Sequence, residues 1–541
     1  MFLSEVSLFE GEPPPRFSGK CVAMIRAVSK SFFSFWAVLI AVLFLCSSCA
    51  RSTDQNKQIT SGLSSSVTLK MYLPGEESKS FSKVLDQINA ILSSRIGATL
   101  DISFISPSKM LRQYPTLFTN GTDFDLIYVS SDANYMQRVA NHYYLEITQD
   151  LLKDNAPALL ETIPDQLWEQ VKANDKVYMI PSSSDYSDRM VFLIRKDLLD
   201  KYGLDTPTSL DELEQYLKLV ASNEEGMIPY QVGETGLELL QAAFLQPRGL
   251  TLVDQNALLA AQTEGLGDSL ISLTDYAPYL DYLQRVYSWK QLGLIPSNAA
   301  ARRTVTYDAF RQGDSALYIG DLDSALLAQM LVEQDNRYRL NEAPWEASII
   351  DLSADQPTGA FPHAPAGIAI RNGSQHVGLA LQVIDLLRND RQLHDLLLYG
   401  IQNEHWVASG NSSWTAGSSF SDYPTNLYAK YAFGSSLDRE PESPPEEYTS
   451  IRNQWKENVV QNSTINCFRP YPGERYSIVS DMELLNIKYL FPLQLGAYDD
   501  PKGYLDHYRE KSRMAVVETY IQVVNDQAVD YCKRMDNPSA F

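Results

Sequence analysis

The chain has 541 residues, which is enough for two or three domains that each bury a full hydrophobic core. Its composition, with 44% hydrophobic and 21% charged residues, is that of an ordinary globular protein. The 67 Asp and Glu residues outnumber the 45 Lys and Arg residues and give a formal net charge of −22. This acidity argues against nucleic-acid binding, which depends on a cationic protein surface.

An apolar stretch near the N-terminus ends at a cysteine. Arg26 and Lys30 precede the apolar run Phe32–Leu45, and small residues then lead to Cys49. A helix that spans a bilayer needs about 20 apolar residues, and this run is shorter. The pattern resembles the lipobox of bacterial lipoproteins. That resemblance implies that residues 1–48 are a signal peptide and that a lipidated Cys49 anchors the chain to the outer face of the cytoplasmic membrane.

An uncleaved transmembrane anchor is the alternative interpretation of this stretch. Cys46 stands where a lipobox usually has Leu. The segment before Met24 is acidic and rich in proline, so translation starts at either Met1 or Met24. Residues 49–66 are mostly polar and lack a hydrophobic period, which predicts a flexible tether.

Beyond the tether, apolar residues alternate as in strands and recur as in helices. Residues 67–73 have the strand period, residues 81–92 place apolar side chains on one helical face, and residues 99–105 alternate again. A further helix leads to an apolar strand at 123–129. Alternating strands and helices with short links predict an α/β fold with mainly parallel sheets and helices on both faces. Ligands of such sheets lie off the carboxyl ends of the strands.

A second block of elements begins with a predicted strand at 190–195. Ser209 and Glu212 have the spacing of a capping box, which predicts that a helix begins after Ser209. Residues 436–446 are charged and rich in proline, and they predict an exposed loop. Further helices are predicted at 270–292 and 325–332. Two more, at 504–508 and 515–531, predict a helical C-terminal region.

Seven short segments in the middle of the chain occur in an order that is typical of one protein family. They are Tyr144–Thr148, Lys176–Pro181, Phe192–Leu199, Lys201–Leu204, Pro207–Glu212, Gly313–Gly320 and Ala366–Ile370. Their order and spacing resemble the extracellular solute-binding proteins of ABC importers, the carbohydrate-type family that includes maltose-binding protein. The region from Gly400 onwards resembles the large lipoprotein branch of Gram-positive bacteria. The resemblance covers residues 67–541 and is densest at 144–213.

This resemblance implies two α/β lobes that close on a solute like a clamp. Lobe 1 would consist of residues 67–189 and about 350–405, and lobe 2 of residues 190–349 and about 406–541. The chain would first cross between the lobes at 190–195. The family also implies a monomer that captures a sugar or oligosaccharide, delivers it to an ABC permease and needs no cofactor, metal or catalytic residue.

Ten residues at strand ends or in loops between the lobes are candidate ligand contacts. Aromatic faces suit the C–H surfaces of sugars, and carboxylates accept hydrogen bonds from sugar hydroxyls. The candidates are Glu76, Tyr128, Ser130 and Asp132 in lobe 1, Asp185 and Tyr186 near the hinge, and Asp321, Trp345, His363 and Trp414 in later loops. The alternative interpretation treats the acids as solvated surface groups, the aromatic residues as core and His363 as a loop residue.

Two other function classes remain open from the sequence. An extracellular glycan hydrolase would need a pair of acids, but acids are too abundant here to be informative, and no GxSxG, HExxH or GxxxxGK[ST] motif occurs. A sensory or adhesion lipoprotein would use the same clamp. The identity of the solute also stays open, with oligopeptides as an alternative to sugars. Cys467 and Cys532 either form a disulfide or stay free, because two cysteines alone do not prove a pairing.

Overall fold

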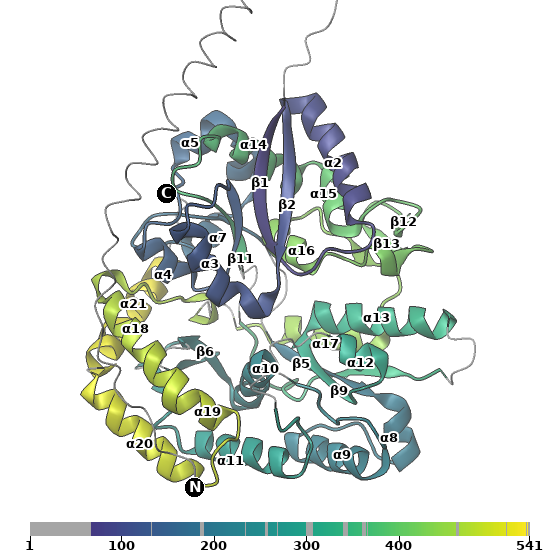
Figure 1. The fold of residues 1–541 in the computed structure, drawn as a ribbon, viewed down its shortest axis with the longest axis vertical. Coiled ribbons are helices and arrows are strands. Elements are labelled where there is room, and N and C mark those ends of the chain that lie inside the picture. The colour runs from purple at the N-terminus through teal and green to yellow at the C-terminus, as the bar shows by residue number, and fades with distance from the viewer. Residues whose placement is uncertain are drawn as a thin grey trace, which may run out of the picture. The chain divides into compact units, whose positions relative to one another are not determined.

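The computed structural model describes residues 66–130, 133–183, 189–232, 234–254, 258–267, 269–298, 307–338, 344–359, 364, 366–460, 465–515, 517–536 and 538. These residues belong to one compact unit, Ser64–Phe541. Two groups of sheets and helices make up this unit (Figure 1). We call residues 66–183 and 366–441 the first lobe, and residues 189–359 and 446–536 the second lobe.

A five-stranded sheet forms the centre of the first lobe. Its order is β2 (Ala98–Ile105), β1 (Val67–Pro74), β3 (Leu126–Ser130), β11 (Ala366–Ile370) and β4 (Ile180–Pro181). β2, β1 and β3 are parallel, whereas β11 is antiparallel to β3 and β4. The sheet is therefore mixed and not mainly parallel. The chain reaches β11 from the second lobe, whereas parallel neighbours such as β1 and β2 are joined by a helix that crosses over the same sheet. Gly367 permits the close approach of β4, since a Cβ atom there would lie 2.2 Å from the Ile180 carbonyl oxygen.

Helices cover this sheet with their apolar stripes. α2 (Phe81–Ile96) buries Phe81, Val84, Ile88 and Leu92, and it ends at Gly97, whose φ of 65° favours glycine. α2 packs against α14 (Val377–Asn389) and α15 (Arg391–Tyr399), as Figure 1 shows. The strand and helix periods of residues 67–105 therefore predicted these elements correctly. The other helices of the lobe are α3 (Met110–Thr119), α4 (Tyr135–Ala140), α5 (Gln149–Asn155), α6 (Pro157–Thr162), α7 (Asp165–Gln170) and α16 (Leu427–Phe433).

A three-stranded antiparallel sheet forms the centre of the second lobe. Its order is β10 (Ala347–Ile350), β5 (Met190–Arg195) and β9 (Leu317–Asp321). β5 is buried on both faces, with Phe192 and Ile194 in one apolar cluster and Val191 and Leu193 in another. This double burial explains its unbroken apolar sequence. The helices of the lobe are α8 (Lys196–Tyr202), α9 (Leu210–Asn223), α10 (Glu234–Leu245), α11 (Ala277–Gln291), α12 (Asp308–Gln312), α13 (Leu322–Tyr338) and α17 (Glu446–Glu457).

The predicted capping box begins α9. The Ser209 hydroxyl accepts a hydrogen bond from the Glu212 N–H at 3.3 Å. The Glu212 carboxylate turns back to the Thr208 N–H, which donates at 2.7 Å. The helix therefore starts with its first amides satisfied, as the sequence spacing predicted.

The C-terminal region is helical, as predicted. α18 (Tyr476–Leu485) and α21 (Val517–Met535) bury apolar side chains against a small antiparallel sheet. That sheet consists of β6 (Leu250–Asp254), β7 (Leu259–Gln262) and β8 (Ile271–Ser272). α19 (Phe491–Gln494) and α20 (Pro501–Met514) join the core of α9 and α11. Cys467 and Cys532 lie in the cluster of α18 and α21, and no disulfide joins these two described residues.

Residues 406–433 differ from the sequence interpretation, which placed them in the second lobe. Trp406, Trp414 and Phe433 are buried in the core of the first lobe. β12 (Trp406–Ser409) pairs with β13 (Ser413–Ala416) there, and β13 pairs with β14 (Glu440–Pro441). The predicted exposed loop at 436–446 therefore contains a strand. Hydrophobic periodicity marks a buried face but does not identify the core that buries it.

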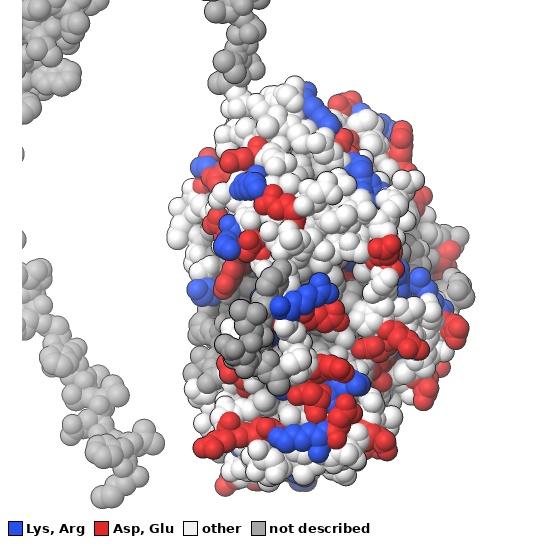
Figure 2. Space-filling view, turned by 90° about the vertical axis from the view of Figure 1, so that its right-hand side faces the viewer, with Lys and Arg blue, Asp and Glu red and all other residues white. Residues whose placement is uncertain are grey.

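No helix among the described residues combines the length and apolar character needed to span a bilayer. The predicted signal peptide, tether and Cys49 lie outside the described residues. On the face in Figure 2, Asp and Glu side chains are interspersed with Lys and Arg side chains. Several surface acids are accordingly paired, as in the contact of Lys83 with Glu404 at 2.7 Å.

Candidate functional site between the lobes

Strands of both lobes end beside one short helix, α16. Tyr428 of α16 packs edge to face against Tyr128 of β3, with ring centroids 6.0 Å apart. The same ring lies beside Gly75, which follows β1. Tyr431, one turn further along α16, interacts with Asp321, the last residue of β9. Because α16 belongs to the first lobe and β9 to the second, both lobes contribute carboxyl strand ends to this place.

Five tyrosines gather here, and we call them the tyrosine cluster: Tyr128, Tyr307, Tyr318, Tyr428 and Tyr431. Tyr428 and Tyr431 pack edge to face with centroids 5.9 Å apart, and Tyr307 and Tyr318 do so at 6.4 Å. Burial, Asp321 and, more weakly, Tyr428 raise the pKa of Tyr318. Each tyrosine of the cluster combines an apolar ring face with a hydroxyl group that can donate a hydrogen bond.

Two carboxylates flank the tyrosine cluster. Asp321 accepts a hydrogen bond from the Ser324 N–H at 2.9 Å. Burial raises the pKa of Asp321, and the neighbouring Asp323 raises it further. Glu76 is exposed in the loop after β1. Burial, Asp308 and, more weakly, Glu76 raise the pKa of Tyr307 to about 12, which places Glu76 of the first lobe near Tyr307 of the second.

A largely buried ion pair joins the lobes beside these acids. The Lys430 ammonium of α16 donates to the Asp323 carboxylate at the start of α13, at 2.6 Å. The two side chains are only 19% and 12% exposed. Among the described residues, no three His, Cys, Asp or Glu side chains gather as ligands for a metal ion. The tyrosine hydroxyls and the carboxylates of this place can donate and accept hydrogen bonds.

The sequence of α16 explains why its tyrosines lie at the edge of the first-lobe core and not inside it. The Asn426 side chain accepts a hydrogen bond from the Ala429 N–H at 3.0 Å and so caps the helix. Ala429, Ala432 and Phe433 fill the core of the first lobe. Tyr428 and Tyr431, spaced three residues apart, lie together on the remaining side and are partly exposed.

The structure brings together three of the ten predicted contacts: Glu76, Asp321 and Tyr128, although Tyr128 is only 5% exposed and lies at the edge of the first-lobe core. Ser130 is buried at the end of β3, where its hydroxyl accepts from the Ala133 N–H at 3.3 Å. Asp132, Asp185, Tyr186 and His363 lie outside the described residues.

The two predicted tryptophans lie in cores. Trp345 is 5% exposed and packs against Arg195, whose guanidinium carbon is 4.1 Å from the ring centroid. Trp414 is 4% exposed and packs against Tyr399 at a centroid distance of 5.4 Å. Tyr428, Tyr431 and Lys430 are not among the contacts predicted from the sequence. Two tyrosines three residues apart lie on the same side of a helix, and this spacing could have indicated an aromatic surface next to the buried side of α16.

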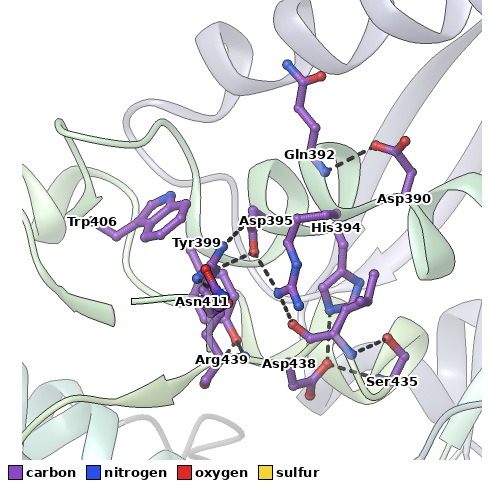
Figure 3. Close-up of polar contacts among 12 residues, drawn as sticks. Asp390, Gln392, His394, Asp395, Tyr399, Trp406, Asn411, Ser435, Asp438 and Arg439 are labelled. Carbon is purple, nitrogen blue, oxygen red and sulfur yellow. Dashed lines mark hydrogen bonds and ion pairs between the residues drawn. The ribbon is translucent and has the colours of Figure 1, made fainter. Parts of the chain in front are cut away.

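The segment that leads from α16 to the second lobe is fixed to α15 by charged groups (Figure 3). Arg439 makes two hydrogen bonds to the Asp395 carboxylate, both at 2.8 Å, and its guanidinium carbon lies 4.7 Å from the Trp406 ring centroid. Asp438 accepts from His394 at 2.9 Å. The chain therefore leaves the first lobe from a rigidly held point next to Lys430, on which Asp438 also acts electrostatically.

Comparison with known proteins identifies the family. The family model for bacterial extracellular solute-binding proteins matches residues 97–393, more than half of the chain. A carbohydrate ABC transporter substrate-binding protein of Streptococcus pneumoniae serotype 4 (strain TIGR4) is 20% identical over 375 residues, which are 68% of this chain and 71% of that protein.

Solved structures show the same fold. The N-glycan transport solute binding protein NgtS of Streptococcus pneumoniae, in complex with Man5GlcNAc, has a TM-score of 0.68 at 17% identity and covers 87% of this chain and 99% of its own. The alginate-binding protein AlgQ2, without calcium ion, has a TM-score of 0.59 at 13% identity and covers 86% and 98%. These proteins have two lobes, so the predicted α/β clamp is confirmed as the fold class.

Proposed function

The chain belongs to the bacterial extracellular solute-binding proteins, and we propose that its solute is an oligosaccharide bound at the tyrosine cluster. One observation carries this proposal: both lobes supply tyrosines and a carboxylate to the same place. Tyr128 and Glu76 come from the first lobe, and Tyr318 and Asp321 come from the second. Tyrosine faces suit the C–H surfaces of sugars, and the acids suit their hydroxyls.

Binding between lobes gives the protein a switch. A ligand that contacts both lobes favours the closed arrangement by the difference in its affinity for the closed and open forms. An ABC permease that recognises the closed form would then receive only loaded protein. The carbohydrate ABC transporter relative supports this partner.

We further propose that the protein works as a monomer held to the membrane by a lipid on Cys49. Residues 1–48 would be removed, and residues 49–66 would serve as the tether. A tethered binder stays within reach of a permease in the same membrane, which raises its effective concentration.

A thermal-shift screen of the chain from residue 50 onwards tests the proposal. The ligands are Man5GlcNAc, maltotriose, oligo-alginate and a set of short peptides. A ligand that binds only the folded state raises the unfolding midpoint as its concentration increases. We expect a shift with one class of oligosaccharide and no change in that sugar on chromatography. A shift with peptides alone would refute the carbohydrate assignment, and release of shorter sugars would indicate a hydrolase.

A further inference from the structure

Lys430 occupies an unusual position between the lobes. Its ammonium is paired with Asp323 of α13 at 2.6 Å. Asp438 of the crossing segment, Tyr399 of α15 and Tyr448 of α17 also act on it electrostatically. All four of these groups belong to elements outside α16, and those elements come from both lobes or lead from one to the other. Lys430 is therefore the meeting point of the two lobes and the segment that joins them.

The charge of Lys430 is maintained despite its burial. Burial alone would lower its pKa, but Asp323 and Asp438 outweigh that effect and hold the pKa well above its usual value. On the other side, His394 and Lys430 together hold the pKa of Asp438 below its usual range, against the effect of burial. Basic and acidic side chains thus alternate from α15 to α13: His394, Asp438, Lys430 and Asp323.

The far end of this charge series reaches the candidate site. Asp323 is two residues from Asp321, and both lie at the turn where β9 becomes α13. α13 packs on both lobes, since Ala325 and Ala328 lie in a core of the second lobe and Leu327 and Leu331 in the core of the first. Fixing Asp323 therefore fixes the start of α13 and with it the Asp321 carboxylate.

We propose that Lys430 is the positioning residue of the site: its ion pair with Asp323 holds the start of α13, and thereby Asp321, against α16 of the other lobe. Lys430 acts through Asp323 and not by contact with the ligand. The pair raises affinity because it stabilises the arrangement in which both lobes present their ligand groups together. The affinity part of this inference rests on the proposed function, whereas the structural part does not.

The structural part is tested without any ligand. Hydrogen exchange is measured at the amides of residues 323–327 in the wild type and in K430M, K430R and D323N. K201M is the matched control, because Lys201 pairs with Glu224 at 2.6 Å within the second lobe. We expect faster exchange in K430M and D323N, near wild-type exchange in K430R, and no change in K201M. Equal exchange in K430M and K201M would overturn the proposal.

A double-mutant cycle tests the affinity part, with Man5GlcNAc or another sugar from the screen that binds the wild type. We expect K430M and D323N each to raise the Kd by at least about tenfold, since each removes the largely buried ion pair that holds the start of α13. In the D323N background, K430M should raise the Kd no further. A full additional loss there would show that Lys430 contacts the ligand itself and would overturn the positioning role. If the wild type binds no sugar, the proposed function fails, and hydrogen exchange alone decides the role of Lys430.

Discussion

The buried His394 ring lies between two oxygen atoms, one of which belongs to the Asp438 carboxylate. Nε2 lies 2.9 Å from the Asp438 carboxylate, and Nδ1 lies 3.0 Å from the Leu387 carbonyl oxygen. Both partners are oxygen acceptors, and the Asp438 carboxylate also accepts from the Ser435 N–H at 2.9 Å. His394 therefore ties α15 to the segment where the chain departs for the second lobe (Figure 3).

Asp438 makes the stability of this segment depend on pH. Its folded-state pKa is lowered, because His394, Lys430 and the Ser435 N–H outweigh the effect of burial. A lowered pKa stabilises the fold above the unfolded value of about 4, and this contribution is lost as the pH falls through the folded pKa. We expect D438N to be less stable than the wild type by about 2 kcal/mol at pH 7. Urea unfolding at a series of pH values should show the difference shrinking below about pH 4, and a constant difference would contradict this assignment.

Tyr428 should contribute directly to sugar affinity. Its ring joins Tyr128 and Tyr431 at the boundary of the lobes. We expect Y428A to raise the Kd for the bound oligosaccharide at least about tenfold, through loss of aromatic contact area. Tyr504 offers a matched control, because it is 38% exposed and stacks on Tyr498, away from the tyrosine cluster. Calorimetric titration should show Y504A binding like the wild type, and equal losses in both variants would locate the sugar elsewhere.

Glu169 and Arg534 should differ in their effect on stability. The carboxylate of Glu169, with a side chain only 2% exposed, contacts Lys172 at 2.8 Å and Arg534 of α21 at 2.7 Å. E169Q removes the carboxylate that pairs with the nearly buried Lys172, so we expect a loss of about 3 kcal/mol in unfolding free energy. R534M removes a side chain that is 41% exposed and should cost less than about 1 kcal/mol. Urea unfolding measures both, and the reverse order would show that α21 depends on Arg534.

Cys49 should decide where the protein resides. We expect C49A to release the protein into the medium or leave it unprocessed, because no lipid can then be attached. C46A is the control, since Cys46 lies within the peptide that is removed. Fractionation of cells and medium distinguishes the outcomes. Retention of C49A at the membrane with its N-terminus intact would indicate an uncleaved transmembrane anchor instead.

The sequence predicted local elements well where one hydrophobic period dominates. β1, α2 and β2 each bury a face that alternation or helical spacing reveals, and the unbroken apolar run of β5 reveals a strand buried on both faces. The sequence did not predict which lobe buries each element of residues 406–433. Trp414 and Phe433 lie in the core of the first lobe, but large apolar side chains of this kind suit the core of either lobe. The Arg439–Asp395 contact holds this segment to α15 of the first lobe, and that contact leaves no local pattern in the sequence.

The candidate site was predictable only in part, for a related reason. Glu76, Tyr128 and Asp321 follow or end strands, and strand ends can be located from periodicity. Tyr428 and Lys430 reach the site from a short helix that follows the re-entry of the chain into the first lobe, and nothing local shows which strands it faces. Trp345 looked like a ligand contact by residue type alone, yet it packs beneath Arg195.

Small-angle X-ray scattering with and without the bound oligosaccharide tests the central claim most directly, namely that the sugar is held between two lobes that close on it. The account predicts that saturating sugar reduces the radius of gyration of the wild type. Y428A, from one lobe, and D321N, from the other, should each require more sugar for the same reduction. Saturable binding with an unchanged radius of gyration, or binding that neither variant weakens, would contradict it.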